Sequence, residues 1–300
     1  MNKKDQQVDP PIPRALTIAG SDSGAGAGIQ ADLKTFAALG IYGLSALTAI
    51  TAQNTEGVRT ALELPTDLIE AQIDAVLEDI GADAAKTGML SSPEIIAAVA
   101  GRVRKWNLRL VVDPVMRAKG GAPLLRPEAV TALREQLLPL AEVITPNLPE
   151  AEVLVEKPIE TLKEMREAAQ AIHDMGPRYV VVKGGHRSAE PIDVYFDGKI
   201  FEELRSERIQ TQHTHGTGCT FSAAITGFLA GGLSVSDAVL GAKRYVTEAI
   251  RNAPGLGHGH GPVDHFWLWK ELQQEPSTTP TLGKRASSVS LWFLRNTEQK

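Results

Sequence analysis

The sequence has 300 residues, enough for one large α/β domain or two small ones. Its 43% hydrophobic content suits a globular core, and its net charge of −5 argues against nucleic acid or an anionic membrane surface as a partner. No apolar run reaches the roughly 18–20 residues that span a bilayer. Cys219 is the only cysteine, which excludes an internal disulfide and a cysteine-based zinc site. We therefore expect a cytoplasmic protein.

Short apolar strands alternate with amphipathic helices along the chain. A first strand at residues 14–19 enters a glycine-rich loop, and the helix after that loop ends at Gly40. Further strands are predicted at residues 44–52, 82–86, 108–112, 143–145 and 179–183, with short extra strands within 58–64 and 193–210. Helices are predicted at residues 66–80, 93–105, 127–138, 162–175, 220–229 and 236–252. This order is typical of a mostly parallel sheet covered by helices on both faces.

The chain favours a single domain. No internal repeat is present, and no linker precedes Pro262. We expect the domain to span residues 14–270. Residues 1–13 are polar and proline-rich and are expected to form a flexible leader. Residues 271–300 are rich in Ser, Thr, Gln and charge and are expected to form a disordered tail.

Residues 20–28 form the first loop at the carboxyl end of a predicted strand and read GSDSGAGAG. Ligands of open α/β sheets bind at such ends. The glycines let the backbone approach a ligand and free amides at the start of a helix. The spacing excludes the dinucleotide fingerprint, and no Gly-Lys-Ser/Thr follows to form a Walker A loop. A tight strand-to-helix turn without chemistry is the alternative.

Residues 214–220, THGTGCT, form a second loop directly before an apolar helix. Gly216 and Gly218 would leave amides at the helix start pointing into one concavity, which favours an anion hole. Cys219 lies in the predicted first turn, where the positive end of the helix is expected to lower the pKa of a thiol. The alternative is an N-capping turn with a buried cysteine.

Residues 145–150, TPNLPE, form a third loop that also opens a helix. Asn147 and Glu150 have the spacing of a capping box. The same two side chains are alternatively suited to organise a hydrated Mg²⁺ at a phosphate site, because Mg²⁺ keeps its waters and takes few carboxylates. The sequence leaves both interpretations open.

Taken in order, these loops belong to a longer set of strings, AGSDSGAGAGIQADLKTFAALG, TAITAQNT, KTGML, VVDPVM, ITPNLPEAEVL, VVKGGH, HGTGCTFSAAI and GHGPVDHF. From about residue 14 to residue 269 the sequence resembles the hydroxymethylpyrimidine/phosphomethylpyrimidine kinases of thiamine biosynthesis. These kinases belong to the ribokinase-like superfamily. The resemblance implies a three-layer ribokinase-like fold with a mostly parallel central sheet, the cofactors ATP and Mg²⁺, a small pyrimidine substrate and a homodimer.

The resemblance also implies roles for individual residues. Those implied for the pyrimidine pocket are Gly20, Asp32, Gln53, Met89 and Val115. Those implied for ATP phosphates are Asn147, Lys183, Gly216, Thr217 and Gly218, with a catalytic group of Lys183, Gly216, Gly218 and Cys219. Glu150 and Asp113 are implied near the metal. Ala25 departs from the family pattern, which commonly has glycine or a similar small residue there.

The implied activity is two successive phosphoryl transfers from ATP, first to a hydroxymethyl group and then to the resulting phosphate ester. A pyridoxal kinase, or dual activity, is the nearest enzyme alternative. A catalytically silent ligand-binding protein would predict damage in the phosphate-binding loops, and the sequence has none. A metal site formed by His258, His260 and His265 is a further alternative, without a supported ligand set.

Overall fold

The computed structural model describes residues 12–185 and 191–274 of the chain. The expected leader and tail lie almost entirely outside these ranges. Within them, the strands form one sheet in the order β3-β2-β1-β4-β5-β6-β7-β8-β9. The strands are β1 (Arg14–Asp22), β2 (Tyr42–Gln53), β3 (Val58–Glu63), β4 (Ala84–Thr87), β5 (Leu110–Val112), β6 (Ala141–Ile144), β7 (Tyr179–Val182), β8 (Ile192–Phe196) and β9 (Phe201–Arg205).

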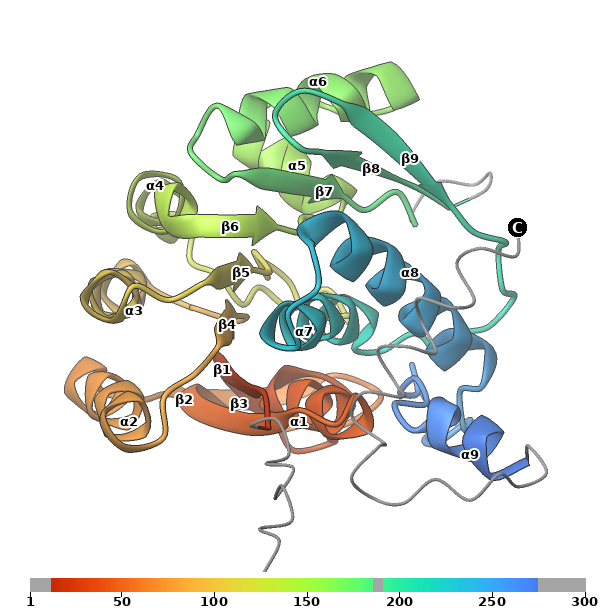
Figure 1. Cartoon of the computed structure of the whole chain (residues 1–300), viewed down its shortest axis with the longest axis horizontal. Helices are drawn as coiled ribbons and strands as arrows, with labels where there is room; N and C mark the ends of the chain where they lie inside the picture. Colours follow the sequence, from red (N-terminus) through yellow and green to blue (C-terminus); the bar gives the residue numbers. More distant parts are fainter. Residues whose placement is uncertain (1–11, 186–190, 275–300) are drawn as a thin grey trace, which may run out of the picture.

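Helices cover both faces of this sheet (Figure 1). One face carries α2 (Thr66–Asp79), α3 (Pro93–Trp106), α4 (Ala129–Ala132), α5 (Leu148–Val155) and α6 (Leu162–His173). The other carries α1 (Gly28–Ala38), α7 (Thr217–Ala230), α8 (Val235–Arg251) and α9 (Trp267–Gln274). The predicted three-layer ribokinase-like fold is confirmed.

The central strands are parallel, from β2 through β1, β4, β5 and β6 to β7. Antiparallel strands flank them, with β3 at one edge and the hairpin of β8 and β9 at the other. Parallel strands place their carboxyl ends at one edge of the sheet. The loops that follow β1, β2, β5, β6 and β7 therefore meet there.

Two apolar cores hold the layers together. On β5, Leu110 and Val112 join the core under α2 to α6, while Val111 joins the core under α7 and α8. Successive side chains of a strand point to opposite faces, and here both faces are covered. This explains why the strands read as continuous apolar runs.

Two segments differ from the predicted elements. The helix expected at residues 127–138 is divided into α4, a π turn at Leu133–Leu137 and a 3-10 turn at Leu138–Leu140. Pro139 has no N–H to continue a regular helix. Helix α9 was not among the predicted elements; its first residue, Trp267, is buried and donates from Nε1 to the Tyr245 carbonyl oxygen at 3.1 Å.

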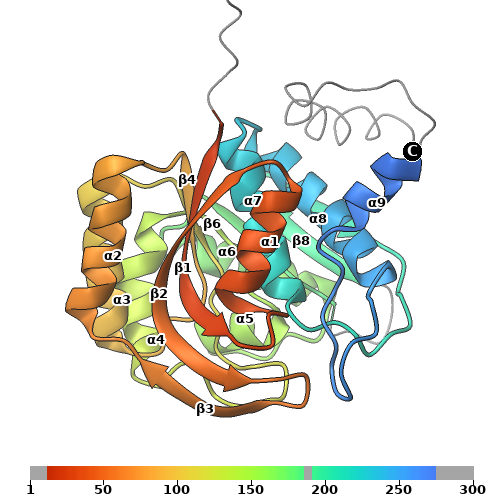
Figure 2. The same ribbon diagram turned by 90° about the horizontal axis from the view of Figure 1, so that it is seen from below.

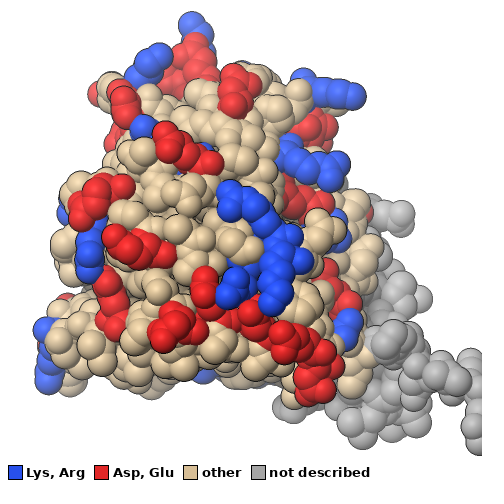
Figure 3. Space-filling view, turned by 90° about the vertical axis from the view of Figure 1, so that its left-hand side faces the viewer, with Lys and Arg blue, Asp and Glu red and all other residues tan. Residues whose placement is uncertain are grey.

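Figure 2 shows β2 and β3 curving away from the central strands as a long twisted pair. On the outer face of α2 and α3, basic and acidic groups are interspersed (Figure 3). Ion pairs there join Arg102 to Glu70 at 2.9 Å and Lys105 to Asp74 at 3.0 Å. In the ranges given above, we find no helix that is both long and apolar enough to cross a membrane.

Candidate active site

The carboxylate of Asp22, at the end of β1, organises the first glycine-rich loop. It accepts hydrogen bonds from the backbone amides of Gly24 at 2.8 Å, Gly26 at 3.1 Å and Ala27 at 2.8 Å. Burial alone would raise the pKa of Asp22, but the hydrogen bonds from His215 and from these amides outweigh it and lower the pKa. The loop is thus closed around an ionised carboxylate.

The backbone of this loop adopts left-handed conformations at two positions. Ala25, where the sequence departs from the resemblance, has φ of 58° and carries the strain that glycine would avoid. Gly28 has φ of 57°, and a Cβ there would lie 2.4 Å from the Gly20 carbonyl oxygen. Only glycine lets α1 begin so close to the end of β1.

The second loop packs directly on the first. α7 begins at Thr217, and its cap Gly216 has φ of 79°. A Cβ on Gly216 would lie 1.7 Å from the Gly26 carbonyl oxygen, so the two backbones are in contact. His215 bonds through Nε2 to Asp22 Oδ2 at 2.9 Å, while the Thr217 hydroxyl donates to the Thr214 carbonyl oxygen at 2.8 Å. The start of α7 is thereby fixed relative to β1.

Lys183 faces the start of α7 from the other side of the site. A Cβ on Gly218 would lie 3.3 Å from Lys183 Nζ and 3.7 Å from Asp113 Oδ2. Lys183 Nζ itself donates to Asp113 Oδ1 at 3.2 Å. Burial would lower the pKa of Lys183, but Asp113 and Glu150 more than offset this and raise it. Lys183 is therefore a cation directed at the helix start.

Asn147 lies next to Lys183, because their loops follow the adjacent parallel strands β6 and β7. The two residues form an isolated parallel bridge, in which the Lys183 amide donates to the Pro146 carbonyl oxygen at 2.8 Å. Asn147 and Glu150 also form the predicted capping box, with hydrogen bonds of 2.8 Å and 2.9 Å between side chain and backbone. The capping interpretation is confirmed.

Glu150 and Asp113 are both buried, at 6% and 2% exposure. Burial raises the pKa of Glu150 to about 7, with Lys183 opposing the rise and Asp113 adding to it. Asp113 and Glu150 share Lys183 as a neighbouring cation, and the raised pKa of Glu150 shows that a second negative charge there is poorly compensated. This donor set suits a divalent cation that takes few carboxylates.

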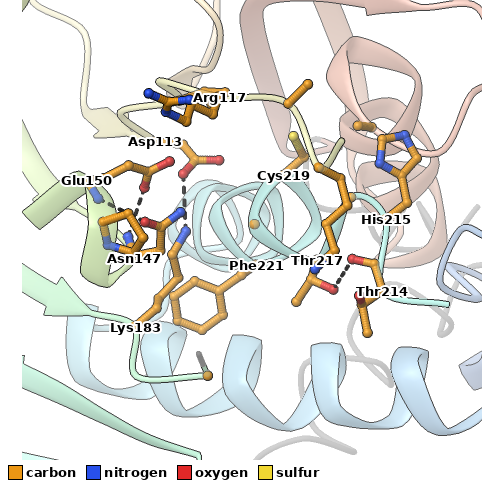
Figure 4. A pocket seen from close by; sticks show the side chains of 18 of the residues that line it. Asp113, Arg117, Asn147, Glu150, Lys183, Thr214, His215, Thr217, Cys219 and Phe221 are labelled. Carbon is orange, nitrogen blue, oxygen red and sulfur yellow. Dashed lines mark hydrogen bonds and ion pairs between the residues drawn. The ribbon is translucent and has the colours of Figure 1, made fainter. Parts of the chain in front are cut away.

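Cys219 is the third residue of α7, in the predicted first turn, and its side chain lies between the two sides of the site (Figure 4). The expectation that the helix start lowers its pKa is wrong. Burial raises the pKa of the thiol to about 12. Lys86 and a hydrogen bond from the Gly28 amide oppose the rise, but Asp32 and Asp113 add to it. The thiol is therefore neutral at physiological pH.

Asp32 is the one predicted site residue that does not reach the cavity. It is fully buried on α1 and forms an ion pair with the equally buried Lys86 at 2.8 Å. Its other oxygen accepts from the Thr17 hydroxyl at 2.7 Å. This corrects the expectation of direct pyrimidine contact, because the carboxylate has no exposed surface. The charges of both Asp32 and Lys86 influence the pKa of Cys219, in opposite directions.

The remaining predicted residues line one cavity of about 1280 Å³. Within this cavity, Gly20 and Met89 face each other, with a Cβ on Gly20 placed 3.1 Å from the methionine sulfur. Gln53 and Val115 line the same cavity. Gly216, Thr217, Gly218 and Lys183 also line it, together with Asp113, Asn147 and Glu150.

Sequence reasoning missed Arg117 and Lys119, which also line the cavity. They lie on a turn after β5 that is closed by a hydrogen bond from the Ala118 amide to the Ala122 carbonyl oxygen at 2.8 Å. In the close-up view, Arg117 lies beside Asp113 (Figure 4). The sequence signal that could have identified them is the presence of two basic residues just after the string VVDPVM.

The histidine-based metal alternative finds no support. Within the parts of the chain that are described, no group of three or more His, Cys, Asp or Glu side chains is placed to hold a metal ion. His265 instead contacts the Thr220 hydroxyl through Nε2 at 3.1 Å, and His260 contacts the Gln212 carbonyl oxygen at 3.1 Å.

The ends of parallel strands here converge on a helix start opened by glycines, a lysine and two carboxylates. This arrangement indicates a phosphotransferase for small molecules. Comparison with known proteins agrees. The chain belongs to the phosphomethylpyrimidine kinase family, whose model matches residues 22–264. Membership in a kinase family implies the use of ATP and a small-molecule acceptor.

The sequences of several named relatives match most of the length of this chain. It is 50% identical over 258 residues to the hydroxymethylpyrimidine/phosphomethylpyrimidine kinase of Bacillus subtilis, covering 85% of this chain and 95% of the relative. It is 53% identical to the thiamine biosynthesis bifunctional protein ThiED of Geobacter sulfurreducens, covering 88% of this chain but 54% of that longer protein.

A solved structure is similar as well. The ADP complex of Bacillus subtilis pyridoxal kinase superposes with a TM-score of 0.82 at 46% identity. The match covers 86% of this chain and 99% of that one. The chain is thus similar both to pyrimidine kinases and to a pyridoxal kinase of the same fold.

Proposed function

We propose that this chain phosphorylates 4-amino-5-hydroxymethyl-2-methylpyrimidine with ATP, first to the monophosphate and then to the diphosphate, in thiamine biosynthesis. The observation that carries the proposal is the close approach of Lys183 to the start of α7, where a Cβ on Gly218 would lie only 3.3 Å from Nζ. The absence of a side chain at position 218 keeps the helix-start amides uncovered beside this cation, and amides and a cation together stabilise a phosphoryl group.

Phosphoryl transfer has a loose transition state, so positioning and charge stabilisation dominate its catalysis. The amides at the start of α7 and the cation of Lys183 bind the oxygens of the group in transit. Because Cys219 is neutral, its S–H serves as a hydrogen-bond donor to these oxygens or to the acceptor hydroxyl. This role replaces the thiolate base that a lowered pKa would have supplied.

Asp113 and Glu150 are the residues that would hold Mg²⁺. Their mutual repulsion and burial support this role, as does the capping box that fixes Glu150 in place. When bound, Mg²⁺ supplies positive charge to the phosphates of ATP. Lys183 forms an ion pair with Asp113, so the residue that would bind the phosphates is in direct contact with a residue that would hold the metal.

Product analysis tests the proposed function. The purified chain is incubated with ATP and the pyrimidine alcohol, and mono- and diphosphate are separated by ion-exchange chromatography. We expect monophosphate to appear first and then to be converted to diphosphate. Accumulation of monophosphate alone would limit the chain to the first transfer, and absence of both products would refute the proposal.

Pyridoxal phosphorylation is the second candidate, supported by the close superposition on a pyridoxal kinase. Kinetics on the pyrimidine alcohol and on pyridoxal, measured side by side, discriminate between them. We expect the pyrimidine to have the higher kcat/KM, because Gln53 and Met89, which the resemblance implies for the pyrimidine pocket, both line the cavity.

We further propose that the protein is a cytoplasmic homodimer. Ile50 and Leu62 support the dimer, because they pair across β2 and β3 and are 46% and 66% exposed. Light scattering after gel filtration tests the oligomeric state. The expected mass is twice the 32.2 kDa of one chain, and a monomer would contradict the proposal.

A further inference from the structure

Residues 116–124, after β5, form a tight hairpin that lines the cavity. The Met116 carbonyl oxygen accepts from the Leu124 amide at 2.9 Å, which closes the base of the hairpin. At the tip, a Cβ on Gly120 would lie 3.7 Å from the Glu56 carbonyl oxygen, in the turn between β2 and β3. The hairpin therefore reaches from the end of β5, past β4 and β1, to the turn after β2.

This span crosses the part of the cavity whose residues the resemblance implies for the pyrimidine. Those residues lie at or just after the ends of β1, β2, β4 and β5, and they are Gly20, Gln53, Met89 and Val115. The residues implied for ATP phosphates instead follow β6 and β7 or open α7. Because the strands lie in the order β2-β1-β4-β5-β6-β7, the two groups divide at β5. The hairpin leaves β5 toward the pyrimidine group.

The hairpin carries two cations, Arg117 and Lys119, and both line the cavity. Neither forms an ion pair with an acidic side chain of the described ranges, whereas Lys183 is paired with Asp113 at 3.2 Å. Lys119 is exposed, yet the walls of the cavity withdraw enough water to lower its pKa, and no carboxylate opposes this shift. Two positive charges thus face the cavity without a counter-charge from the protein.

The base of the hairpin is fixed beside the candidate metal site. The backbone of Met116 forms a hydrogen bond to the Glu150 carboxylate, and Arg117 is the next residue along the chain. Figure 4 shows Arg117 beside Asp113. The two cations therefore start next to the residues that would hold Mg²⁺ and extend from there over the pyrimidine group.

The second proposed transfer brings two phosphates together in this cavity. An oxygen of the monoester phosphate attacks the γ-phosphorus of ATP and forms a new P–O bond. The bond from the γ-phosphorus to its bridging oxygen breaks, and its electron pair leaves on ADP. Above pH 7 the monoester carries close to two negative charges, so this transfer releases no proton. Cations beside the acceptor phosphate stabilise this encounter, whereas the hydroxyl acceptor of the first transfer is uncharged.

We propose that Arg117 and Lys119 bind the phosphate of the monoester acceptor and thereby determine specificity for the second transfer. This inference rests on the proposed function, because the monoester is an acceptor only in the second transfer. The hairpin places both cations at the acceptor, while Lys183 faces the transferred group from the end of β7. The pyrimidine alcohol has no phosphate and makes no use of them.

The test assays the two transfers separately, with the alcohol or its monophosphate as acceptor and with saturating ATP. In Lys119→Met, kcat/KM for the monophosphate should fall roughly 10- to 100-fold, as for the loss of one hydrogen bond to a charged group, chiefly through a higher KM. The value for the alcohol should change little. Arg117→Met should act in the same direction, and Lys119→Arg, which keeps the charge, should restore most of the activity on the monophosphate.

Lys157→Met is the matched control. Lys157 lines the same cavity but lies beyond the far end of α5, roughly 10 Å along the helix from Glu150. This variant removes an equal charge from the cavity away from the hairpin. Its ratio of kcat/KM values for the two acceptors should match that of wild type.

Calorimetric titration measures acceptor binding without turnover. Lys119→Met should weaken binding of the monophosphate by a similar factor and leave binding of the alcohol unchanged. Equal losses on both acceptors, or no loss on the monophosphate, would overturn the inference. A higher KM for ATP with both acceptors would assign the two cations to the phosphates of ATP and would contradict it as well. If wild type does not phosphorylate the monophosphate, the proposed second transfer fails, and the titration still decides whether the hairpin binds the ester phosphate.

Discussion

Gly216 lies directly against Gly26, so closely that a Cβ on Gly216 would stand 1.7 Å from the Gly26 carbonyl oxygen. This contact joins the anion-hole loop to the loop after β1. Gly216→Ala must separate the two loops and shift the amides at the start of α7. We expect kcat/KM to fall on the order of 100-fold, since small displacements of positioned groups cost about that much.

Gly232→Ala is the matched control for this prediction. Gly232 has a similar left-handed φ of 88°, but a Cβ there would meet no atom within 4 Å. Both variants place an alanine at a similar left-handed φ. A difference in their steady-state kinetics, at a temperature where both are folded, therefore reports the contact between the two loops. Similar activities of the two variants would show that the contact between the loops is not needed.

The buried pair of Lys86 and Asp32 gives a prediction about stability. Burial pulls the pKa of Lys86 down, but Asp32 and the further negative groups around the lysine, Asp113 among them, together raise it, so the lysine is charged. Lys86→Met leaves an unpaired buried carboxylate and should lower the free energy of unfolding by about 3–5 kcal/mol in urea titration. Lys105→Met breaks a pair whose lysine is 46% exposed and should cost less than about 1 kcal/mol. Equal costs would contradict the prediction.

Much of the site was predictable because parallel strands bring their following loops together. The meeting of Asn147 and Lys183 follows from the adjacency of β6 and β7. The capping box at Asn147 follows from residue spacing alone, and so does the place of Cys219 in the first turn of α7. These are local properties, or properties of strand order, and sequence patterns carry both.

What could not be predicted depends on contacts between distant residues. The helical spacing of apolar residues predicts that Asp32 lies on α1. It does not predict that Lys86 of β4 forms an ion pair with Asp32. The pKa of Cys219 depends on its desolvation and on the carboxylates of Asp32 and Asp113, which are distant in the sequence. The contact that anchors helix α9, from Trp267 Nε1 to the Tyr245 carbonyl oxygen, likewise joins distant residues.

His265 gives a prediction about pH. Burial, with the positive charge of Lys34 adding to it and Asp264 opposing it, lowers the pKa of His265 from 6.5 to about 4. Between these values the unfolded chain binds a proton that the folded chain does not, so stability falls as the pH falls from about 6.5 to 4. The loss approaches roughly 3 kcal/mol.

His265→Gln keeps a polar group for Thr220 but does not titrate. Its free energy of unfolding should therefore fall less steeply than that of wild type between pH 7 and pH 4, as followed by urea titration at each pH. The exposed His258→Gln is the control and should retain the wild-type slope. An unchanged slope in His265→Gln would assign the acid sensitivity to other groups.

The neutral thiol of Cys219 gives a prediction about the difference between the two phosphoryl transfers. In the second transfer the nucleophile is already an ionised phosphate oxygen, which needs no base. An aspartate at position 219 would set a fixed negative charge beside it, and two unit charges about 4 Å apart repel by about 4 kcal/mol at an effective dielectric of 20. An alcohol nucleophile meets no such repulsion, and a general base is worth roughly 10²–10⁴-fold to it.

We therefore expect Cys219→Asp to lose far more activity with the pyrimidine monophosphate than with the alcohol, by up to about 1,000-fold if the full repulsion acts. The two transfers are assayed separately, each with saturating ATP. Cys219→Ser keeps a neutral donor and should affect both steps to a similar extent. Equal losses on both acceptors in Cys219→Asp would show that charge at position 219 does not govern the second transfer, and that the thiol is retained for its size or its hydrogen bond alone.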